Sequence, residues 1–261
     1  MRDIALASAL ALCVFAPGDA AGDLLADQRL AASWAAAGDL RGERIELNDD
    51  GGTFFALHAP SDLPEVRGAV VILHDQGTNA DSHEVVQPLR LGLPGGGWET
   101  LSLQLPSVPE RARRADWLGT HAVISGRLQA GLEWLRGRDL KRLVVIGVGD
   151  SGPVAVQFLA DKGSSDLLGV VLVSSAITED SVVGGLAVLR TLQQPVLDLY
   201  AANDVATVYD NADARRRAGA QLPAGNFRQV AVAGARAGFV GVQEQLVATV
   251  RAWLAAHSAG R

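Results

Sequence analysis

Thiols are almost absent from this sequence, which contains a single cysteine, Cys13, among 261 residues. Cys13 lies inside an apolar run from Ile4 to Ala16. Leu12 in front of it is bulky and the residues behind it are apolar, so we interpret Cys13 as apolar filler and not as a site of lipid attachment. Once this run is removed, the chain can form no disulfide and can hold no cysteine nucleophile.

The same apolar run is too short to span a bilayer, which takes about 20 residues. Arg2 gives it a basic start, and Pro17-Gly18-Asp19-Ala20-Ala21 supplies a helix break and small residues for cleavage. We therefore predict a signal peptide at residues 1–21, a periplasmic or secreted bacterial protein, and no stable membrane insertion after signal removal. An N-terminal helical segment at 22–42 and a domain at 43–261 are predicted to follow.

An excess of positive charge is also missing. The chain has 23 Lys and Arg residues against 29 Asp and Glu residues, so its formal net charge is −6. This balance argues against nucleic acid and an anionic membrane surface as partners, and leaves an unknown small molecule or protein. Two basic runs, Arg111 to Arg114 and Arg215 to Arg217, are accordingly interpreted as solvated surface.

Motifs for cofactors and metals are missing as well. The glycines at 95–97 belong to neither a Gly-x-x-x-x-Gly-Lys nor a Gly-x-Gly-x-x-Gly pattern, and we interpret them as a flexible connection. Asp81-Ser82-His83-Glu84 lacks the two-histidine helical spacing of zinc hydrolases and is interpreted as a polar helix start. We expect no cofactor and no metal.

Apolar and amphipathic segments alternate through most of the chain. Two short β segments around the Asp/Gly turn at 48–52 predict an N-terminal β-hairpin. Beyond Gly68, apolar runs typical of strands buried on both faces alternate with helical periodicity. The predicted strands are 44–47, 53–58, 69–73, 99–103, 143–146, 168–173, 196–200 and 227–232, and the predicted helices are 84–91, 122–135, 153–161 and 244–256. This order predicts an α/β fold with a mostly parallel, doubly wound sheet and a short lid at 175–194.

The segment Gly147-Val148-Gly149-Asp150-Ser151-Gly152 joins a buried strand to a helix. Such a turn presents a nucleophilic serine in the pattern Gly-x-Ser-x-Gly. The middle position here is Gly149, which has no side chain to attack with. Glycine also suits a tight turn with unusual backbone angles. The motif therefore predicts a fold more strongly than a reaction.

With these elements placed, the chain resembles the α/β-hydrolase superfamily over nearly all of its length beyond the signal. His74-Asp75-Gln76-Gly77 ends the first core strand, where such proteins often carry His-Gly-x-Gly. The turn around Gly149 looks like the nucleophile elbow. Asn203-Asp204 follows the strand after which the family's acid usually sits, and residues 233–239 look like the loop that normally holds the histidine.

More narrowly, the chain looks like an uncharacterised group of exported proteobacterial proteins, domain-of-unknown-function family 3530. The similarity lies in Pro88-Leu89-Arg90, in the Gly-Trp-x-Thr-Leu-Ser pattern at 97–102, and in Trp253-Leu254 of the final helix. In that group the elbow often lacks serine too. The resemblance implies the fold and says little about activity, because function depends on sites and not on folds.

The resemblance implies a vestigial catalytic triad. Its nucleophile position is Gly149, its histidine position is Ala237 and its acid position is Asp204. No histidine lies between Asp204 and Trp253. Without an imidazole to orient, Asp204 is expected to serve ordinary turn chemistry.

An oxyanion site would use the backbone N–H of Asp150 and one from Asp75 or Gln76. Backbone donors survive side-chain changes, but the carboxylates of Asp75 and Asp150 would oppose a developing negative charge. We expect the Asp150 carboxylate to cap the following helix. The candidate binding residues are His74, Asp75, Gln76, Gly77 and Asp150.

Two alternatives stay open. Ser151 could act as a displaced nucleophile with His74 in an esterase-like serine hydrolase, if their side chains come within hydrogen-bond reach. Otherwise Ser151 is a helix-start hydroxyl, and His74 is a strand-end residue whose ring nitrogens hold neighbouring loops. The second alternative is a periplasmic interaction module without a ligand cleft. Our leading prediction is an exported α/β-hydrolase-fold protein that is not catalytic.

Overall fold

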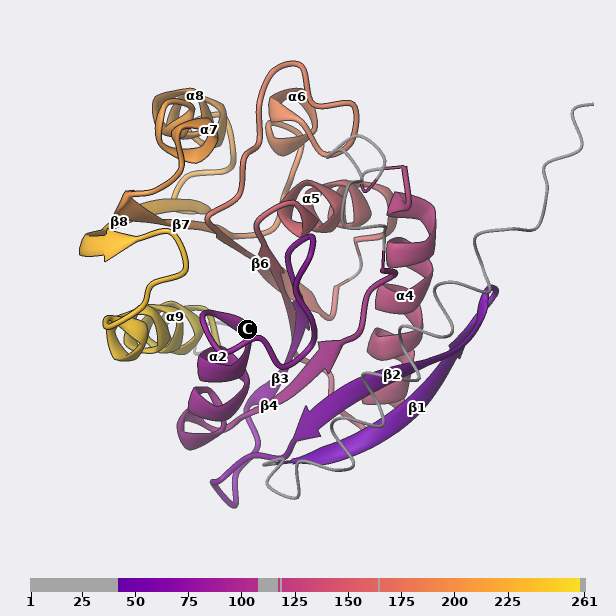
Figure 1. The fold of residues 1–261 in the computed structure, drawn as a ribbon. Helices are drawn as coiled ribbons and strands as arrows, with labels where there is room; N and C mark the ends of the chain where they lie inside the picture. Colours follow the sequence, from indigo (N-terminus) through magenta and orange to yellow (C-terminus); the bar gives the residue numbers. More distant parts are fainter. Residues whose placement is uncertain (1–41, 108–116, 118, 164, 259–261) are drawn as a thin grey trace, which may run out of the picture.

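The computed structural model describes residues 42–107, 117, 119–163 and 165–258. The predicted signal peptide, nearly all of the N-terminal helical segment and the Arg111 to Arg114 run lie outside these residues. In the described part, a twisted sheet lies between two sets of helices (Figure 1). No helix in that part is long and apolar enough to cross a membrane.

The strands of the described residues form one eight-stranded sheet in the order β1-β2-β4-β3-β5-β6-β7-β8. The β1–β2 and β2–β4 pairs are antiparallel, and every other neighbouring pair is parallel. The sequence-based prediction of a mostly parallel sheet with an N-terminal β-hairpin is therefore confirmed. The strands are β1 (Glu43–Asp49), β2 (Gly52–Ala59), β3 (Gly68–Leu73), β4 (Trp98–Leu103), β5 (Leu143–Val148), β6 (Leu167–Val173), β7 (Val196–Asn203) and β8 (Phe227–Arg236).

The central strands β3, β4, β5 and β6 are buried at every residue. Their side chains alternate between the two faces of the sheet, as strand geometry requires. Val71 and Leu73 of β3 belong to the core on one face, and Val70 and Ile72 belong to the core on the other. This burial on both faces explains the unbroken apolar runs of the sequence.

Helices cover both faces of the sheet (Figure 1). Leu128 of α4, Phe158 of α5 and Leu186 of α6 belong to the core on one face. Leu89 of α2 and Trp253 of α9 belong to the core on the other. The helical segments are α2 (Val86–Gly92), η1 (Pro94–Gly96), α4 (His121–Gly137), α5 (Ser151–Lys162), α6 (Leu186–Leu189), α7 (Ala206–Tyr209), α8 (Ala212–Gly219) and α9 (Gln243–Ser258).

The segment 175–194, predicted as a short lid, packs into the core on the α5 side of the sheet. Its buried side chains Ile177, Val183, Leu186, Leu189 and Leu192 all belong to that core. It contributes none of the residues that line the pocket beside Gly149. The apolar residues of this segment therefore extend the core instead of covering the site.

Arg215 is a buried residue, and its interpretation as solvated surface is wrong. Its guanidinium is fully buried and donates from Nε to Asp198 Oδ2 at 2.8 Å and from Nη1 to the Val208 carbonyl at 2.7 Å. Gln229 donates to the same Asp198 oxygen at 2.8 Å. One face of α8 turns inward against β7 and β8, so the run Arg215 to Arg217 mixes one interior with two exposed side chains.

Candidate functional site around Gly149

The predicted elbow forms at the carboxyl end of β5. Gly149 has φ of +55°, in the left-handed region that glycine enters at least cost, and α5 begins two residues later at Ser151. The Gly149 N–H donates to the Val173 carbonyl at 2.9 Å, which ties the turn to the neighbouring strand β6. The turn therefore has the backbone shape predicted for the elbow, with a glycine at its middle position.

The Asp75 carboxylate fills the space in which a side chain at position 149 would start. A Cβ built on Gly149 would lie 2.1 Å from Asp75 Cγ and 2.2 Å from each carboxylate oxygen. Asp75 Oδ1 accepts hydrogen bonds from the N–H of Gln76 at 2.8 Å and from the N–H of Asp150 at 2.7 Å. These are the backbone donors that the sequence predicts for an oxyanion, and a carboxylate of the chain itself occupies them.

Asp150 contributes its backbone N–H to the site, and its side chain does not cap α5. It occupies the position before α5, but its side chain makes no capping hydrogen bond there. The prediction of a carboxylate cap is therefore wrong. The backbone N–H at this position bonds instead to Asp75, which brings a negative charge to the start of α5 where the helix dipole favours it.

Ser151 is fully buried and hydrogen-bonded to the main chain. Its Oγ accepts from the Val148 N–H at 2.9 Å and lies 2.9 Å from the carbonyl oxygens of Leu73 and Val148, either of which can take its single proton. These contacts tie the start of α5 to the ends of β3 and β5. The hydroxyl faces the protein interior, away from solvent.

His74 is also buried, with both ring nitrogens engaged. Nε2 accepts from the Leu105 N–H at 3.0 Å, so the proton lies on Nδ1, which donates to the Asp75 carbonyl at 2.8 Å. The pKa of His74 is lowered to about 4, chiefly by burial; the hydrogen bond to the Asp75 carbonyl opposes this shift, and the charge of Arg127 adds to it. The imidazole is therefore neutral at pH 7 and holds the loop after β3 in place.

Asp204 lies at the end of β7, as predicted for the acid position. Its Oδ2 accepts from the Ala201 N–H at 2.9 Å and from the Ser174 hydroxyl at 2.5 Å, and its Oδ1 accepts from the Val205 N–H at 2.8 Å. These bonds lie within its own turn or reach the end of β6. Asp204 thus stabilises the turn, and no histidine is among these hydrogen-bond partners.

Ala237, the predicted histidine position, brings no imidazole to the site. β8 continues to Arg236, and Ala237 and Gly238 follow in the turn before α9. A Cβ on Gly238 would lie 2.6 Å from Glu84 Oε2, so a carboxylate lies over this turn. Three of the other described histidines form hydrogen bonds away from this turn: His58 with Glu99, His83 with Gln87, and His257 with the Trp253 carbonyl. His121 lies at the start of α4.

A pocket of about 220 Å³ opens beside Gly149. Among the described residues that line it, three side chains are carboxylates and none is a lysine or an arginine. Among the described residues, no group of three or more His, Cys, Asp or Glu side chains is arranged to hold a metal ion. The lining residues are Asp75, Thr78, Ser82, Glu84, Val85, Val86, Val148, Gly149, Ser174, Asp204, Val205, Ala237 and Gly238.

Sequence reasoning missed several members of this pocket, among them Ser174 and Glu84. Ser174 follows β6 with φ of +49°, a backbone conformation unusual for serine, and donates to Asp204. No motif marks it in the sequence. Glu84 was assigned only to a polar helix start, although the turn at Gly238 brings it over the histidine position.

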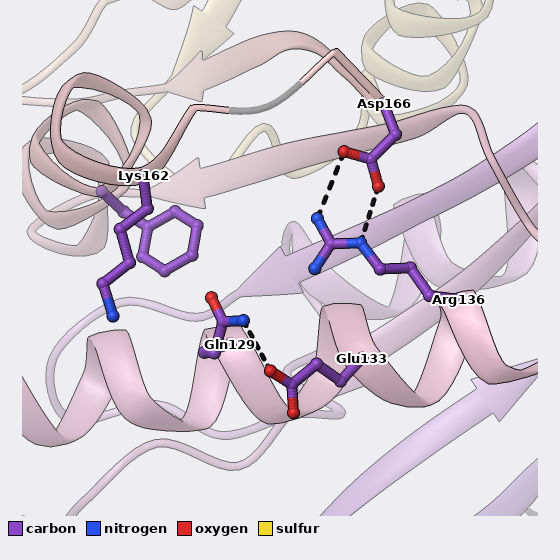
Figure 2. Close-up of a pocket in the computed structure, with 6 residues that line it drawn as sticks. Gln129, Glu133, Arg136, Lys162 and Asp166 are labelled. Carbon is purple, nitrogen blue, oxygen red and sulfur yellow. Dashed lines mark hydrogen bonds and ion pairs between the residues drawn. The ribbon is translucent and has the colours of Figure 1, made fainter.

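A larger hollow of about 580 Å³ lies between α4 and α5, away from the elbow (Figure 2). Arg136 forms two hydrogen bonds with Asp166, and Gln129 donates to Glu133 across one helical turn. Together, Arg136 and Lys162 give the wall two positive charges, and Glu133 and Asp166 give it two negative charges. Because its charges balance and Arg136 is paired with Asp166, this hollow shows no chemistry comparable to that around Gly149.

Comparisons with known proteins agree with the fold. A family model described as "Protein of unknown function (DUF3530)" matches residues 24–116 and 110–256. No curated protein matches the chain.

Solved structures of α/β hydrolases resemble the chain. Est1E from Butyrivibrio proteoclasticus has a TM-score of 0.66 at 14% identity, over 83% of this chain and 99% of its own. Dienelactone hydrolase from Anabaena variabilis ATCC 29413 has a TM-score of 0.64 at 17% identity, over 83% and 99%. An alpha-beta serine hydrolase homologue from Coxiella burnetii has a TM-score of 0.63 at 16% identity, over 83% and 97%. At these identities the likeness shows the fold alone.

Proposed function

The chain belongs to the DUF3530 family of proteins of unknown function, and because that family description names no activity, we propose a function from the pocket itself. The protein is a non-catalytic member of the α/β-hydrolase fold that binds a small molecule or a segment of another protein beside Gly149. The apolar N-terminal run supports export to the periplasm.

One observation carries this proposal: the Asp75 carboxylate occupies both the starting point of the missing nucleophile and the two N–H donors of the oxyanion site. Acyl transfer needs a nucleophile, and it needs those donors to be open to the negative charge that develops on the substrate oxygen. A fixed carboxylate at that point would repel this charge. The adjacent pocket keeps its volume of about 220 Å³ beside Asp75 and has room for a ligand.

The environments of Ser151 and His74 support inactivity further. The Ser151 hydroxyl is bonded to backbone groups, and the ring nitrogens of His74 are bonded to Leu105 and to Asp75. A nucleophile and its base must share a hydrogen bond or come close to it. No contact of this kind joins the two side chains, so nothing favours the esterase-like alternative.

The pocket also favours a ligand-binding protein over an interaction module without a cleft. Valines and Ala237 share its wall with hydroxyl and carboxylate groups. Binding sites for small molecules commonly combine apolar walls with a few placed polar groups. At about 220 Å³, the pocket suits a ligand of modest size or a single side chain of a partner.

The test uses the purified chain without residues 1–21. We expect no turnover of short-chain nitrophenyl esters above the buffer rate, and no mass increase after incubation with a fluorophosphonate probe. The matched control is Ser151→Ala, which removes the candidate nucleophile. Stoichiometric labelling of Ser151, or ester turnover that disappears in Ser151→Ala, would overturn the proposal.

A further inference from the structure

We propose that β8 is a pairing edge, along which two copies of this chain join their sheets by antiparallel β8–β8 pairing about a two-fold axis at Ala231. The partner that fits this edge is thus a second copy of the chain. The inference goes beyond the proposed function and does not depend on it. Because β8 leads directly into Ala237 and Gly238 of the pocket wall, one end of the paired edge adjoins the candidate site.

β8 is the last strand of the sheet and has only β7 as a neighbouring strand among the described residues. It lies at the rim of the sheet, with α8 on one side and α9 on the other (Figure 1). Its 10 residues compare with about 5–6 in a mean strand. An edge of this length presents a row of main-chain N–H and C=O groups that another strand can match.

The direction of these main-chain groups follows from one hydrogen bond. The Val196 N–H of β7 donates to the Asn226 carbonyl at 2.7 Å, just before β8 begins. In a parallel ladder, the even-numbered residues of 228–232 then direct their N–H and C=O groups towards β7, and Gln229 and Ala231 direct theirs outward. No hydrogen bond from the described part of the chain reaches these outward groups, so water or another strand satisfies them.

The charge pattern of β8 differs from that of the opposite edge strand, β1. Sheets commonly protect an exposed edge with charged side chains, which discourage pairing with another chain. Residues 230–235 of β8 carry no charge, and their small side chains leave the backbone accessible. β8 therefore lacks the protection that β1 has, as expected for an edge that is used. The charged residues of β1 are Glu43, Arg44, Glu46 and Asp49.

A second copy fits this edge when the two strands cross at Ala231. The two Ala231 residues then exchange both of their outward N–H···O bonds, as in a hydrogen-bonded pair of an antiparallel ladder. Val230 lies opposite Val232 of the second copy, which gives a favourable pair of β-branched side chains on the α9 side of the sheet. Arg228 lies opposite Gly234, which has no side chain to oppose the guanidinium.

Neighbouring registers fit less well. A crossing at Val232 would place Arg228 directly opposite Arg236, and like charges in that position are destabilising. A crossing at Val230 would leave residues 234–236 of each strand without a partner. A crossing between two residues would set outward groups against groups that already bond to β7. The sequence of β8 thus selects the register at Ala231.

Sedimentation velocity of the chain without residues 1–21, over about 1–100 µM, tests the proposal. We expect a monomer–dimer equilibrium that shifts to dimer as the concentration rises. Ala231→Pro removes the outward N–H at the axis and no bond to β7, so it should fold and raise the Kd of the dimer at least about 10-fold.

Ala231→Lys provides a second route if the proline variant folds poorly. It places two like charges opposite each other at the axis and should raise the Kd at least about 3-fold. The matched control is Ala122→Lys, which adds the same charge at an exposed alanine of α4, a helix that packs against β1 at the other edge of the sheet. This control should associate as wild type does.

Amide hydrogen exchange locates the interface. The Ala231 N–H should exchange readily at low concentration and become protected in the dimer, whereas the N–H groups of Val230 and Val232 should be protected at both concentrations. Symmetric pairing uses the β8 edge of both copies, so assembly should stop at two.

The proposal is overturned if the chain stays monomeric up to about 100 µM, which is also the result expected if β8 receives a strand from a different protein. Assemblies that grow beyond two copies would overturn it too, because they require a second, unlike edge. So would a dimer in which exchange of the Ala231 amide is unchanged, or one that Ala231→Lys leaves as stable as Ala122→Lys does.

Discussion

The carboxylate of Asp75 lies directly against Gly149, at 2.1–2.2 Å from the position that a Cβ on this glycine would take. The loop after β3 and the elbow after β5 are adjacent because these strands pair in parallel. A side chain at 149 and the present position of Asp75 therefore exclude one another. The absence of the serine and the placement of the aspartate are two aspects of one arrangement.

Gly149→Ser should lower the free energy of unfolding and should create no esterase. The new Cβ collides with Asp75, and φ of +55° strains any residue other than glycine, which together cost about 1–3 kcal/mol or more. Urea unfolding measures the loss.

The matched control for that substitution is Gly77→Ser. Gly77 has φ of +72°, and nothing lies within 4 Å of a Cβ built there, so this variant carries backbone strain without a collision. The double variant Asp75→Gly with Gly149→Ser should lose less free energy of unfolding than the sum of the losses in the two single variants, by about 0.5–3 kcal/mol. Equal losses in Gly149→Ser and Gly77→Ser would contradict the steric part of the account.

Ser151→Ala should destabilise the protein by about 1–3 kcal/mol, because it leaves the buried Val148 N–H without the acceptor that the hydroxyl provides. Thr249→Ala on the exposed face of α9 removes a comparable hydroxyl–carbonyl bond near solvent and should change stability by less than about 0.5 kcal/mol. Thermal or urea unfolding of the two variants makes the comparison. A neutral Ser151→Ala would mean that the hydroxyl is not part of the framework.

Because of His74, the free energy of unfolding should decrease as the pH is lowered from about 6.5 to about 4. Its folded pKa of about 4 lies below the usual histidine value of 6.5, so folding favours the neutral imidazole. The stabilisation is complete above pH 6.5 and is lost as pH falls towards 4, by up to about 3 kcal/mol. In His74→Gln the free energy of unfolding should depend less on pH over this window. An unchanged slope would show that the histidine is not buried as described.

Arg215→Ala should be among the most destabilising single changes, at about 3–5 kcal/mol, because it leaves the buried carboxylate of Asp198 without its cation. Arg216→Ala removes the neighbouring charge on the exposed side of α8 and should leave the unfolding midpoint unchanged within error. Similar midpoints for the two variants would place Arg215 at the surface.

Periodicity predicted the strands and most helices well, because residues such as Val70 and Val71 must both be apolar when helices cover both faces of a sheet. It did not predict the interior position of Arg215. A buried guanidinium and a solvated one have the same sequence signature, and only the packing of α8 against β7 distinguishes them. Three of the short helices, α6, α7 and α8, were likewise too brief for their periodicity to indicate them.

The sequence also predicted that the Asp150 N–H, one N–H from Asp75 or Gln76, and two carboxylates would gather at one edge of the sheet. It could not predict which carboxylate would take the donors. Asp150 was expected to cap α5, yet Asp75 reaches across from β3 and accepts from both N–H groups. That choice depends on a side-chain rotamer and on the free space above Gly149, and neither leaves a pattern in the sequence.

A crystal structure of the mature chain at neutral pH, resolved well enough to place side-chain oxygens, tests the central claim most directly. The account predicts one oxygen of the Asp75 carboxylate within about 3.2 Å of both the Gln76 and the Asp150 nitrogen atoms. A carboxylate turned into the pocket, with water or an ion bound to the two N–H groups in its place, would contradict it.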